Sequence, residues 1–299
     1  MKKIILLFFL MHICFVSMGS NETQDGEKKA ALLMVHFGTT FDDTRAATID
    51  AINEKAKDEF PEMKVVEAYT SRIIISRLAK RGIVKPTPRE ALLKLAAEGY
   101  THVFIQSTNV IDGIEAESLR NEADYMVPFF KDLRIGRPLL YSTEDCLNVE
   151  KILAERYSSS KGKNSAVVLI GHGTETPANA IYSQMDYMFG AEGNHDFHVA
   201  TVEGYPTFGT TLAKLRSSKV KNVTLVPFMF VAGDHARNDI AGDWKEDLEK
   251  EGFKVSVIIE GLGQIPAIQD IYIQHIKDGL KERPLTPVER KAAFIKENL

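Results

Sequence analysis

From residue 30 onward, short runs of apolar and β-branched residues alternate with longer stretches in which apolar residues recur every three or four positions. This alternation predicts strands separated by helices, and therefore parallel sheets covered by helices on both faces. One helix start is well marked, because Thr87 can cap the helix, Pro88 suits its first position and Glu90 completes a capping box. The expected strands are 31–36, 64–69, 102–107, 138–142, 165–170, 197–203, 222–228 and 254–260.

The second half of the chain repeats the first. "LMVHFGTT" at 33–40 matches "VLIGHGTE" at 168–175, and "VVEAYTS" at 65–71 matches "TVEGYPT" at 201–207. A third pair, "HVFIQSTNVIDG" from position 102 and "NVTLVPFMFVAGD" from position 222, follows in the same order. We therefore expect two similar doubly wound α/β domains with a cleft between them. Their expected bounds are 31–143 and 144–283, followed by a tail helix over 284–299.

Residues 1–19 have the features of a secretory signal peptide. Lys2 and Lys3 precede the apolar run 4–16, and Ser17 and Gly19 are small residues of the kind that a signal peptidase requires. The run is too short to span a bilayer comfortably, and no later segment approaches the roughly 20 apolar residues that a transmembrane helix needs. The sequence predicts a periplasmic or otherwise exported protein with a polar linker over 20–30 and no stable membrane insertion after cleavage.

Charge and cysteine content argue against a nucleic-acid partner and against features that need more than one cysteine. The formal net charge is −4, and the basic residues are scattered rather than clustered, so a nucleic-acid partner is not expected. Loss of the signal peptide would also remove Cys14 and leave Cys146 alone. An intramolecular disulfide and a thiolate metal site are then both excluded.

The two halves differ in three polar positions that follow expected strands. The second half carries His172, Glu203 and His235 where the first has Phe37, Glu67 and Glu115. The carboxyl ends of parallel strands meet at one edge of the sheet, so the three side chains of the second half could converge there. Two imidazoles and a carboxylate suit Co²⁺, Ni²⁺, Fe²⁺ or Zn²⁺ and leave coordination positions open. A neutral imidazole can also accept a proton, so a metal site and a base could share residues.

A phosphate-binding turn is an alternative interpretation of "GHGT" at 171–174, since glycines before a helix can bind an anion. The turn lacks the lysine of a Walker motif and the three-glycine spacing of a dinucleotide site. A phosphate-ester enzyme is therefore ranked last.

Three segments carry a family resemblance: "GHGTETPANAIY" (171–182), "TVEGYP" (201–206) and "PFMFVAGDHARNDIAGDW" (227–244). They resemble the anaerobic sirohydrochlorin cobaltochelatases, class II chelatases related in fold to ferrochelatase, and the likeness extends from Ala31 to Lys281. The resemblance implies insertion of Co²⁺ into a reduced tetrapyrrole with loss of two protons and without a nucleotide. It also implies that His172, Glu203 and His235 bind the metal, with His172 and Glu203 as the catalytic pair.

The tetrapyrrole implied by the resemblance carries many carboxylates, which cationic side chains should bind. The candidates are Arg45, Arg72 and Arg237, near the ends of expected strands. The chain departs from the family pattern at Thr176 and Asn109, where histidine is common.

The sequence leaves several choices open. Fe²⁺ and Ni²⁺ are compatible with the same ligands, and neither haem binding nor a homo-oligomer is decided by the residues. An exported carrier of metal or tetrapyrrole, built on the chelatase fold but without turnover, is the main alternative.

Overall fold

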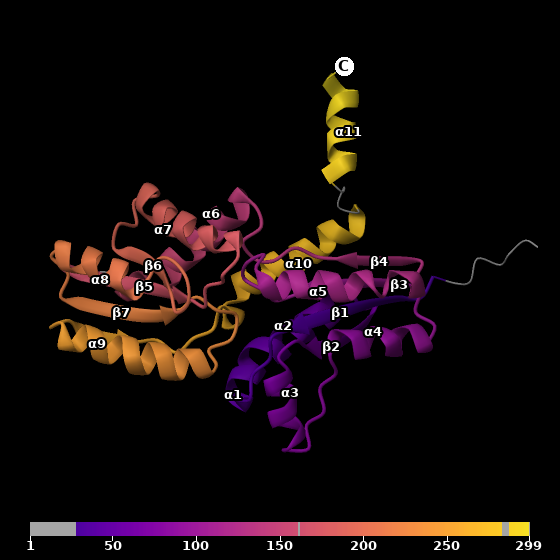
Figure 1. The fold of residues 1–299 in the computed structure, drawn as a ribbon, viewed down its shortest axis with the longest axis horizontal. Coiled ribbons are helices and arrows are strands. Elements are labelled where there is room, and N and C mark those ends of the chain that lie inside the picture. The colour runs from indigo at the N-terminus through magenta and orange to yellow at the C-terminus, as the bar shows by residue number, and fades with distance from the viewer. Residues whose placement is uncertain (1–27, 161, 283–286, 299) are drawn as a thin grey trace, which may run out of the picture.

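The computed structural model describes residues 28–160, 162–282 and 287–298. It shows two four-stranded parallel sheets with helices packed around each (Figure 1). The expected signal peptide, most of the expected linker and the start of the expected tail lie outside the described residues. Within the described part, no helix is both long and apolar enough to cross a membrane.

The two sheets have the same topology. The first has the order β2-β1-β3-β4, and the second has the order β6-β5-β7-β8. The strands are β1 Ala30–His36, β2 Lys64–Tyr69, β3 His102–Ser107, β4 Asp132–Ile135, β5 Ser165–Gly171, β6 Phe197–Thr201, β7 Asn222–Pro227 and β8 Lys254–Val257. Because each repeated segment holds the same place in its sheet, the prediction of two similar doubly wound α/β domains is confirmed.

Helices join the strands throughout, as the apolar periodicity predicts. The α-helices are α1 Asp42–Arg45, α2 Ala51–Glu59, α3 Arg72–Ala79, α4 Pro88–Ala97, α5 Ile114–Asp124, α6 Thr143–Arg156, α7 Ala180–Ala191, α8 Phe208–Ser217, α9 Lys245–Lys250, α10 Pro266–Lys281 and α11 Pro287–Asn298. Two segments are π-helical, η1 Ala46–Asp50 and η5 Ala236–Trp244, and short 3₁₀ turns occupy η2 Val127–Phe129, η3 Ser158–Ser160, η4 Pro177–Asn179 and η6 Leu262–Gln264. The capping box of Thr87 and Glu90 at the start of α4 is confirmed.

The fourth strand of the first sheet is not where the sequence pattern places it. β4 comprises Asp132–Ile135, which pairs with His102–Ile105, whereas 138–142 was the expected strand. The backbone N–H groups of Leu139 and Leu140 instead donate to the carbonyls of Asn109 and Val110, beyond the end of β3. Both leucines are buried, so the apolar run reflects packing of a connecting segment rather than sheet pairing.

Helix α10 follows the second sheet in the chain but packs against the first (Figure 1). A Cβ added to Gly279 would lie 2.5 Å from two atoms of the Phe104 ring of β3, so only glycine fits at this contact. The Tyr272 hydroxyl donates to the carbonyls of Thr108 (3.0 Å) and Asn109 (3.1 Å). Residues of α10 belong to one apolar cluster that also contains residues of β1 and β5. The hydrophobic core is therefore continuous between the two halves.

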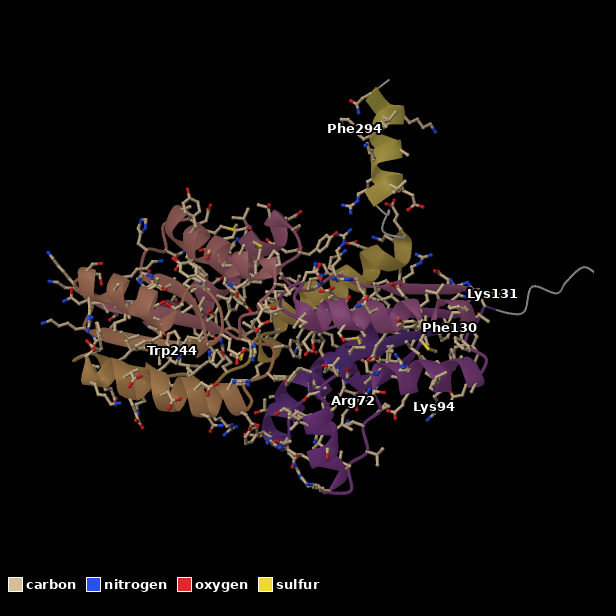
Figure 2. The ribbon with its side chains drawn as sticks, in the orientation of Figure 1. Arg72, Lys94, Phe130, Lys131, Trp244 and Phe294 are labelled. Atoms are coloured by element: carbon tan, nitrogen blue, oxygen red, sulfur yellow. The ribbon has the colours of Figure 1, made fainter. Side chains whose placement is uncertain are left out.

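Two aromatic side chains in the C-terminal part of the chain lie in opposite environments. Trp244 is 7% exposed and meets the Phe208 ring edge to face, with the ring centroids 4.9 Å apart. Phe294 lies on α11, which projects away from both sheets (Figure 2).

Candidate metal centre

Two glycines determine the backbone of the turn that follows β5. A Cβ added to Gly171 would lie 2.2 Å from the Tyr182 ring, and one added to Gly173 would lie 1.2 Å from the carbonyl oxygen of Glu203. Gly173 also has a φ of +92°, and its counterpart Gly38 has a φ of +100°. Glycine adopts such values without the steric cost that a Cβ brings. A Cβ added to Gly38 would lie 2.5 Å from the Tyr69 ring, so the turn depends on glycine for conformation and for space in both halves.

Backbone hydrogen bonds extend the β5–β6 pairing beyond the two strands. The N–H of Val202 donates to the Gly171 carbonyl at 2.9 Å, and the N–H of Glu203 donates to the His172 carbonyl at 2.7 Å. The Gly173 N–H donates to the buried phenol oxygen of Tyr182, whose pKa burial raises to about 12. The backbone of Glu203 is therefore fixed beside that of His172.

The structure brings two of the predicted ligands together. The imidazoles of His172 and His235 meet edge to face, with ring centroids 4.6 Å apart. Nδ1 of His172 lies 3.1 Å from the Gly173 carbonyl, and Nδ1 of His235 lies 2.5 Å from Oδ2 of Asp239. Because a carbonyl and a carboxylate accept a hydrogen bond, each Nδ1 carries a proton, and in the neutral imidazole Nε2 then presents a lone pair. Among the described residues, no hydrogen bond engages either Nε2.

Asp239 is a functional candidate that the sequence reasoning missed. It lies four residues after His235 on the same helical segment, so the two side chains face each other. A carboxylate on the second nitrogen of a metal-binding imidazole fixes the ring orientation and tautomer. The spacing His-x₃-Asp was the available signal. Asp234, the neighbouring residue in the sequence, pairs instead with Arg77 of the first half.

Glu203 is beside the histidines along the backbone, but its side chain does not complete a preformed site. In the part of the chain that the structure describes, no group of three or more His, Cys, Asp or Glu side chains is arranged to hold a metal ion. Glu203 is exposed, follows β6 by two residues and is held through its backbone N–H. The predicted triad is thus present as two apposed imidazoles with a carboxylate-bearing residue beside them.

The three candidate arginines lie at different places. Arg45 pairs with Asp42 (2.8 Å) and Asp50 (3.4 Å) on its own helical segment. Arg237, two residues after His235, is 3.3 Å from Oδ2 of Asp43 in the first half.

Arg72 lines a polar cavity of about 220 Å³ in the first half, together with Thr70, Glu115 and Glu122 (Figure 2 shows Arg72). Within this cavity, Oγ1 of Thr70 and Oε2 of Glu122 are buried and have no hydrogen-bond partner. Its lining includes neither of the apposed histidines.

The two departures from the family pattern have ordinary local contacts. Oγ1 of Thr176 lies 3.4 Å from Oγ1 of Thr174, inside the turn that follows His172. Asn109 follows β3, and its carbonyl accepts hydrogen bonds from Leu139 and Tyr272. Its side-chain Nδ2 is buried without a partner.

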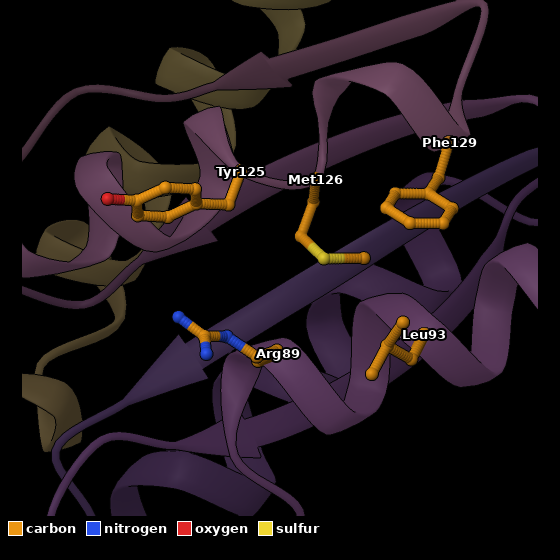
Figure 3. Close-up of a pocket in the computed structure, with 5 residues that line it drawn as sticks. All are labelled: Arg89, Leu93, Tyr125, Met126 and Phe129. Atoms are coloured by element: carbon orange, nitrogen blue, oxygen red, sulfur yellow. The ribbon is translucent and has the colours of Figure 1, made fainter.

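A larger cavity, of about 500 Å³, lies elsewhere in the first half (Figure 3). Its lining comes from α4 and from the end of α5 and the turn after it, and consists of Arg89, Leu93, Tyr125, Met126 and Phe129. This lining is largely apolar and contains none of the predicted site residues.

His36 shows what a structural histidine looks like in this chain. It is 1% exposed, and its two ring nitrogens lie 3.0 Å from Oγ1 of Thr108 and from Oδ1 of Asn53. Burial lowers the pKa of His36 to about 4. Both nitrogens are occupied, so His36 cannot bind a metal without losing a buried hydrogen bond. His172 and His235, in contrast, are partly exposed and each leaves one nitrogen available.

Known proteins resemble this chain over most of its length. A curated sirohydrochlorin cobaltochelatase of Salmonella typhimurium is 37% identical over 257 residues, which cover 84% of this chain and 97% of the relative. The sirohydrochlorin cobaltochelatase CbiKC of Nitratidesulfovibrio vulgaris is 30% identical over 254 residues, covering 83% and 89%.

Solved structures support the fold independently. SirB from Bacillus subtilis, solved with Fe³⁺, superposes with a TM-score of 0.60 at 16% identity, covering 84% of this chain and 95% of SirB. CbiX, described as the terminal enzyme of sirohaem biosynthesis in denitrifying bacteria, superposes with a TM-score of 0.54 at 14% identity, covering 83% and 98%. The sequence model of the family described as cobalt chelatase (CbiK) matches residues 30–281. The chain therefore belongs to the CbiK family of cobalt chelatases.

Proposed function

We propose that the chain is a sirohydrochlorin cobaltochelatase, which inserts Co²⁺ into the reduced tetrapyrrole without ATP. Family membership supports the proposal, as do the names of both curated relatives. The observation that carries it is the pair of imidazoles in edge contact, each with Nδ1 occupied and Nε2 available. Such a pair is suited to a borderline divalent cation and leaves coordination positions open for the macrocycle.

In this proposal the metal is a substrate that the protein binds first and then releases. Nε2 of His172 and Nε2 of His235 bind Co²⁺, and the carboxylate of Glu203 joins them by rotation of its exposed side chain. The backbone of Glu203 is already held beside His172, so only side-chain torsions need to change. An incompletely preformed site suits a chelatase, because a closed site would retain the metal.

The reaction also requires a proton acceptor, since two pyrrole N–H protons leave as the metal enters. His172 and Glu203 are the proposed acceptors, because both would lie against the macrocycle once the metal transfers. Proton transfer to partly exposed groups allows release to solvent.

The carboxylates of the tetrapyrrole call for cations at the rim of the site. Of the three candidate arginines, Arg237 is the one whose sequence position and contacts adjoin the metal residues, because it lies on the same helical segment as His235. Arg45 is already paired with two carboxylates of its own segment. We therefore assign Arg237 the first place among the proposed substrate-binding residues.

A direct assay tests the function. The protein is incubated anaerobically with sirohydrochlorin and Co²⁺, and metal insertion is followed by the change in absorption of the macrocycle. We expect His172→Ala and His235→Ala to lose most of the activity, whereas His195→Ala, which removes an exposed histidine outside the site, should leave it unchanged. A wild-type rate equal to that of the metal-only control would refute the enzyme. Tight binding of Co²⁺ or sirohydrochlorin without insertion would instead identify the carrier alternative.

We further propose that the protein is exported, on the strength of the charged start, the apolar run and the small residues before position 20. Cobalamin and sirohaem synthesis take place in the cytoplasm, so an exported chelatase would need a tetrapyrrole on the other side of the membrane. N-terminal sequencing of the protein recovered from a periplasmic fraction tests this. A first residue at or near Ser20 supports export, and an intact Met1 in the cytoplasmic fraction contradicts it.

A further inference from the structure

The segment that carries His235 is docked on the other half of the molecule. This segment consists of residues 230–237, after β7. It packs beside residues 36–44 and helix α3 of the first half. Its first residue, Phe230, stacks with the His36 ring at a centroid distance of 6.2 Å. A Cβ added to Gly233 would come within 3.8 Å of Oγ1 of Thr39. Phe230 and Gly233 thus both contact the first half before η5 begins.

Two ion pairs between the halves lie on either side of His235. Asp234, immediately before it, has Oδ2 2.8 Å from Nη1 of Arg77 on α3. Arg237, two residues after it, is held by Asp43 at 3.3 Å and lies over the Phe41 ring at 4.2 Å. His235 thus lies between two residues whose side chains are both anchored in the first half.

The internal repeat shows that the two halves use the same turn in different ways. Residues 37–40 of the first half are the counterpart of 172–175, which carry His172 in the second half. In the first half the histidine position is Phe37, and no metal set accompanies it among the described residues. The same turn, with the helix start that follows it, instead contacts the segment bearing His235. One copy of the duplicated turn supplies a proposed ligand, and the other copy supports a second one.

We infer that Arg77 and Asp43 are positioning residues that hold His235 against His172, so that metal affinity in the second half depends on docking to the first. The inference rests on the metal site described under the proposed function. It assigns no contact with the metal to Arg77 or Asp43, which act through Asp234 and Arg237. The first half thereby regulates the affinity of a site to which it contributes no proposed ligand.

The first set of variants changes only first-half residues, so that the proposed ligands and Arg237 remain in place. Arg77→Ala, Asp43→Asn and the double variant are titrated with Co²⁺ alone, and the visible absorption of bound Co²⁺ reports its coordination. Exposed ion pairs have modest strength, so we expect each single variant to weaken Co²⁺ binding about two- to fivefold and the double variant about tenfold. We also expect an altered Co²⁺ spectrum. Arg216→Ala breaks a comparable exposed pair with Glu251 within the second half and should change neither quantity.

Rescue by charge exchange separates positioning from general stability. The variant Arg77→Asp combined with Asp234→Arg should recover the wild-type affinity and spectrum, whereas Arg77→Asp alone should not. If the double variant of Arg77 and Asp43 binds Co²⁺ like the wild type while His172→Ala does not bind, the positioning role is wrong and the proposed metal site stands. If His172→Ala and His235→Ala both bind Co²⁺ like the wild type, the proposed metal site is wrong, and the positioning role falls with it.

Discussion

Substitution of Gly173 by alanine tests whether the turn after β5 creates the metal site. The added Cβ would be 1.2 Å from the carbonyl oxygen of Glu203, and real Cβ atoms do not approach closer than 3.0 Å. The two backbones must therefore separate by about 1.8 Å. A shift of this size breaks the hydrogen bond from the Glu203 N–H to the His172 carbonyl, which now has a length of 2.7 Å.

The expected loss of stability has two parts. The positive φ of Gly173 costs a residue with a Cβ about 1–2 kcal/mol, and loss of the hydrogen bond costs a further ~0.5–1.5 kcal/mol. We expect Gly173→Ala to lower the free energy of unfolding by about 1.5–3.5 kcal/mol. Because metal–ligand distances tolerate only about 0.2 Å, Co²⁺ binding should weaken by at least about tenfold.

Gly252→Ala is the matched control. Gly252 has a φ of +90°, and an added Cβ there would meet no atom within 4 Å, so this variant carries only the conformational cost. Unfolding in urea can be followed by the fluorescence of Trp244, the single tryptophan of the chain, which is buried in the second half. If Gly173→Ala unfolds at the same urea concentration as Gly252→Ala and binds Co²⁺ like the wild type, the reasoning about this turn is wrong.

Three other substitutions or measurements follow from the structure. Asp239→Asn should weaken Co²⁺ binding about tenfold by releasing the His235 ring, whereas Asp247→Asn, on the following helix α9, should not; equal effects would contradict the orienting role. The pKa of His36 is lowered from 6.5 to about 4 by burial, so the unfolded chain binds the extra proton and stability falls as the pH drops from 6.5 toward 4, by up to about 3 kcal/mol. Urea unfolding at pH 7 and pH 4.5 should show a smaller pH effect in His36→Gln than in the wild type, and an equal effect would exclude His36 as its source. Burial raises the pKa of Cys146 to about 11, so a thiol reagent at pH 8 should not label it in the folded protein. In denaturant one thiol should react if the signal peptide has been removed, and two if Cys14 remains.

The sequence predicts the sheets well where a repeat supports the pattern. The segments 64–69 and 102–107 become strands with the expected bounds, because apolar runs flanked by turn residues occur there. The exception, 138–142, is apolar for another reason: Leu139 and Leu140 are buried beyond the end of β3 without forming a strand. Periodicity reports burial, and burial alone does not distinguish a paired strand from a packed connection.

The site was predictable to the extent that it depends on sheet topology. β5 and β7 are neighbours, so residues that follow them meet at one edge, and His172 and His235 are in ring contact there. The side-chain direction of Glu203 does not follow from topology, since an exposed glutamate has several rotamers. The sequence also could not predict the ion pairs of Arg77 with Asp234 and of Arg237 with Asp43, because they depend on how the two halves dock.

The packing of α10 on the first sheet has a consequence for the order in which the molecule is assembled. The first half of the chain is made first, but α2 covers the face of its sheet around Phe104 only in part, and α10 completes the cover with residues up to Gly279. The earliest segment to be synthesised is thus the last to complete its core, and it must wait for nearly the whole chain. A chain cut between residues 143 and 144 would give a first fragment with an uncovered apolar face. The two halves share an internal repeat and a topology, yet the first half completes its core only with a helix that follows the second half in the chain.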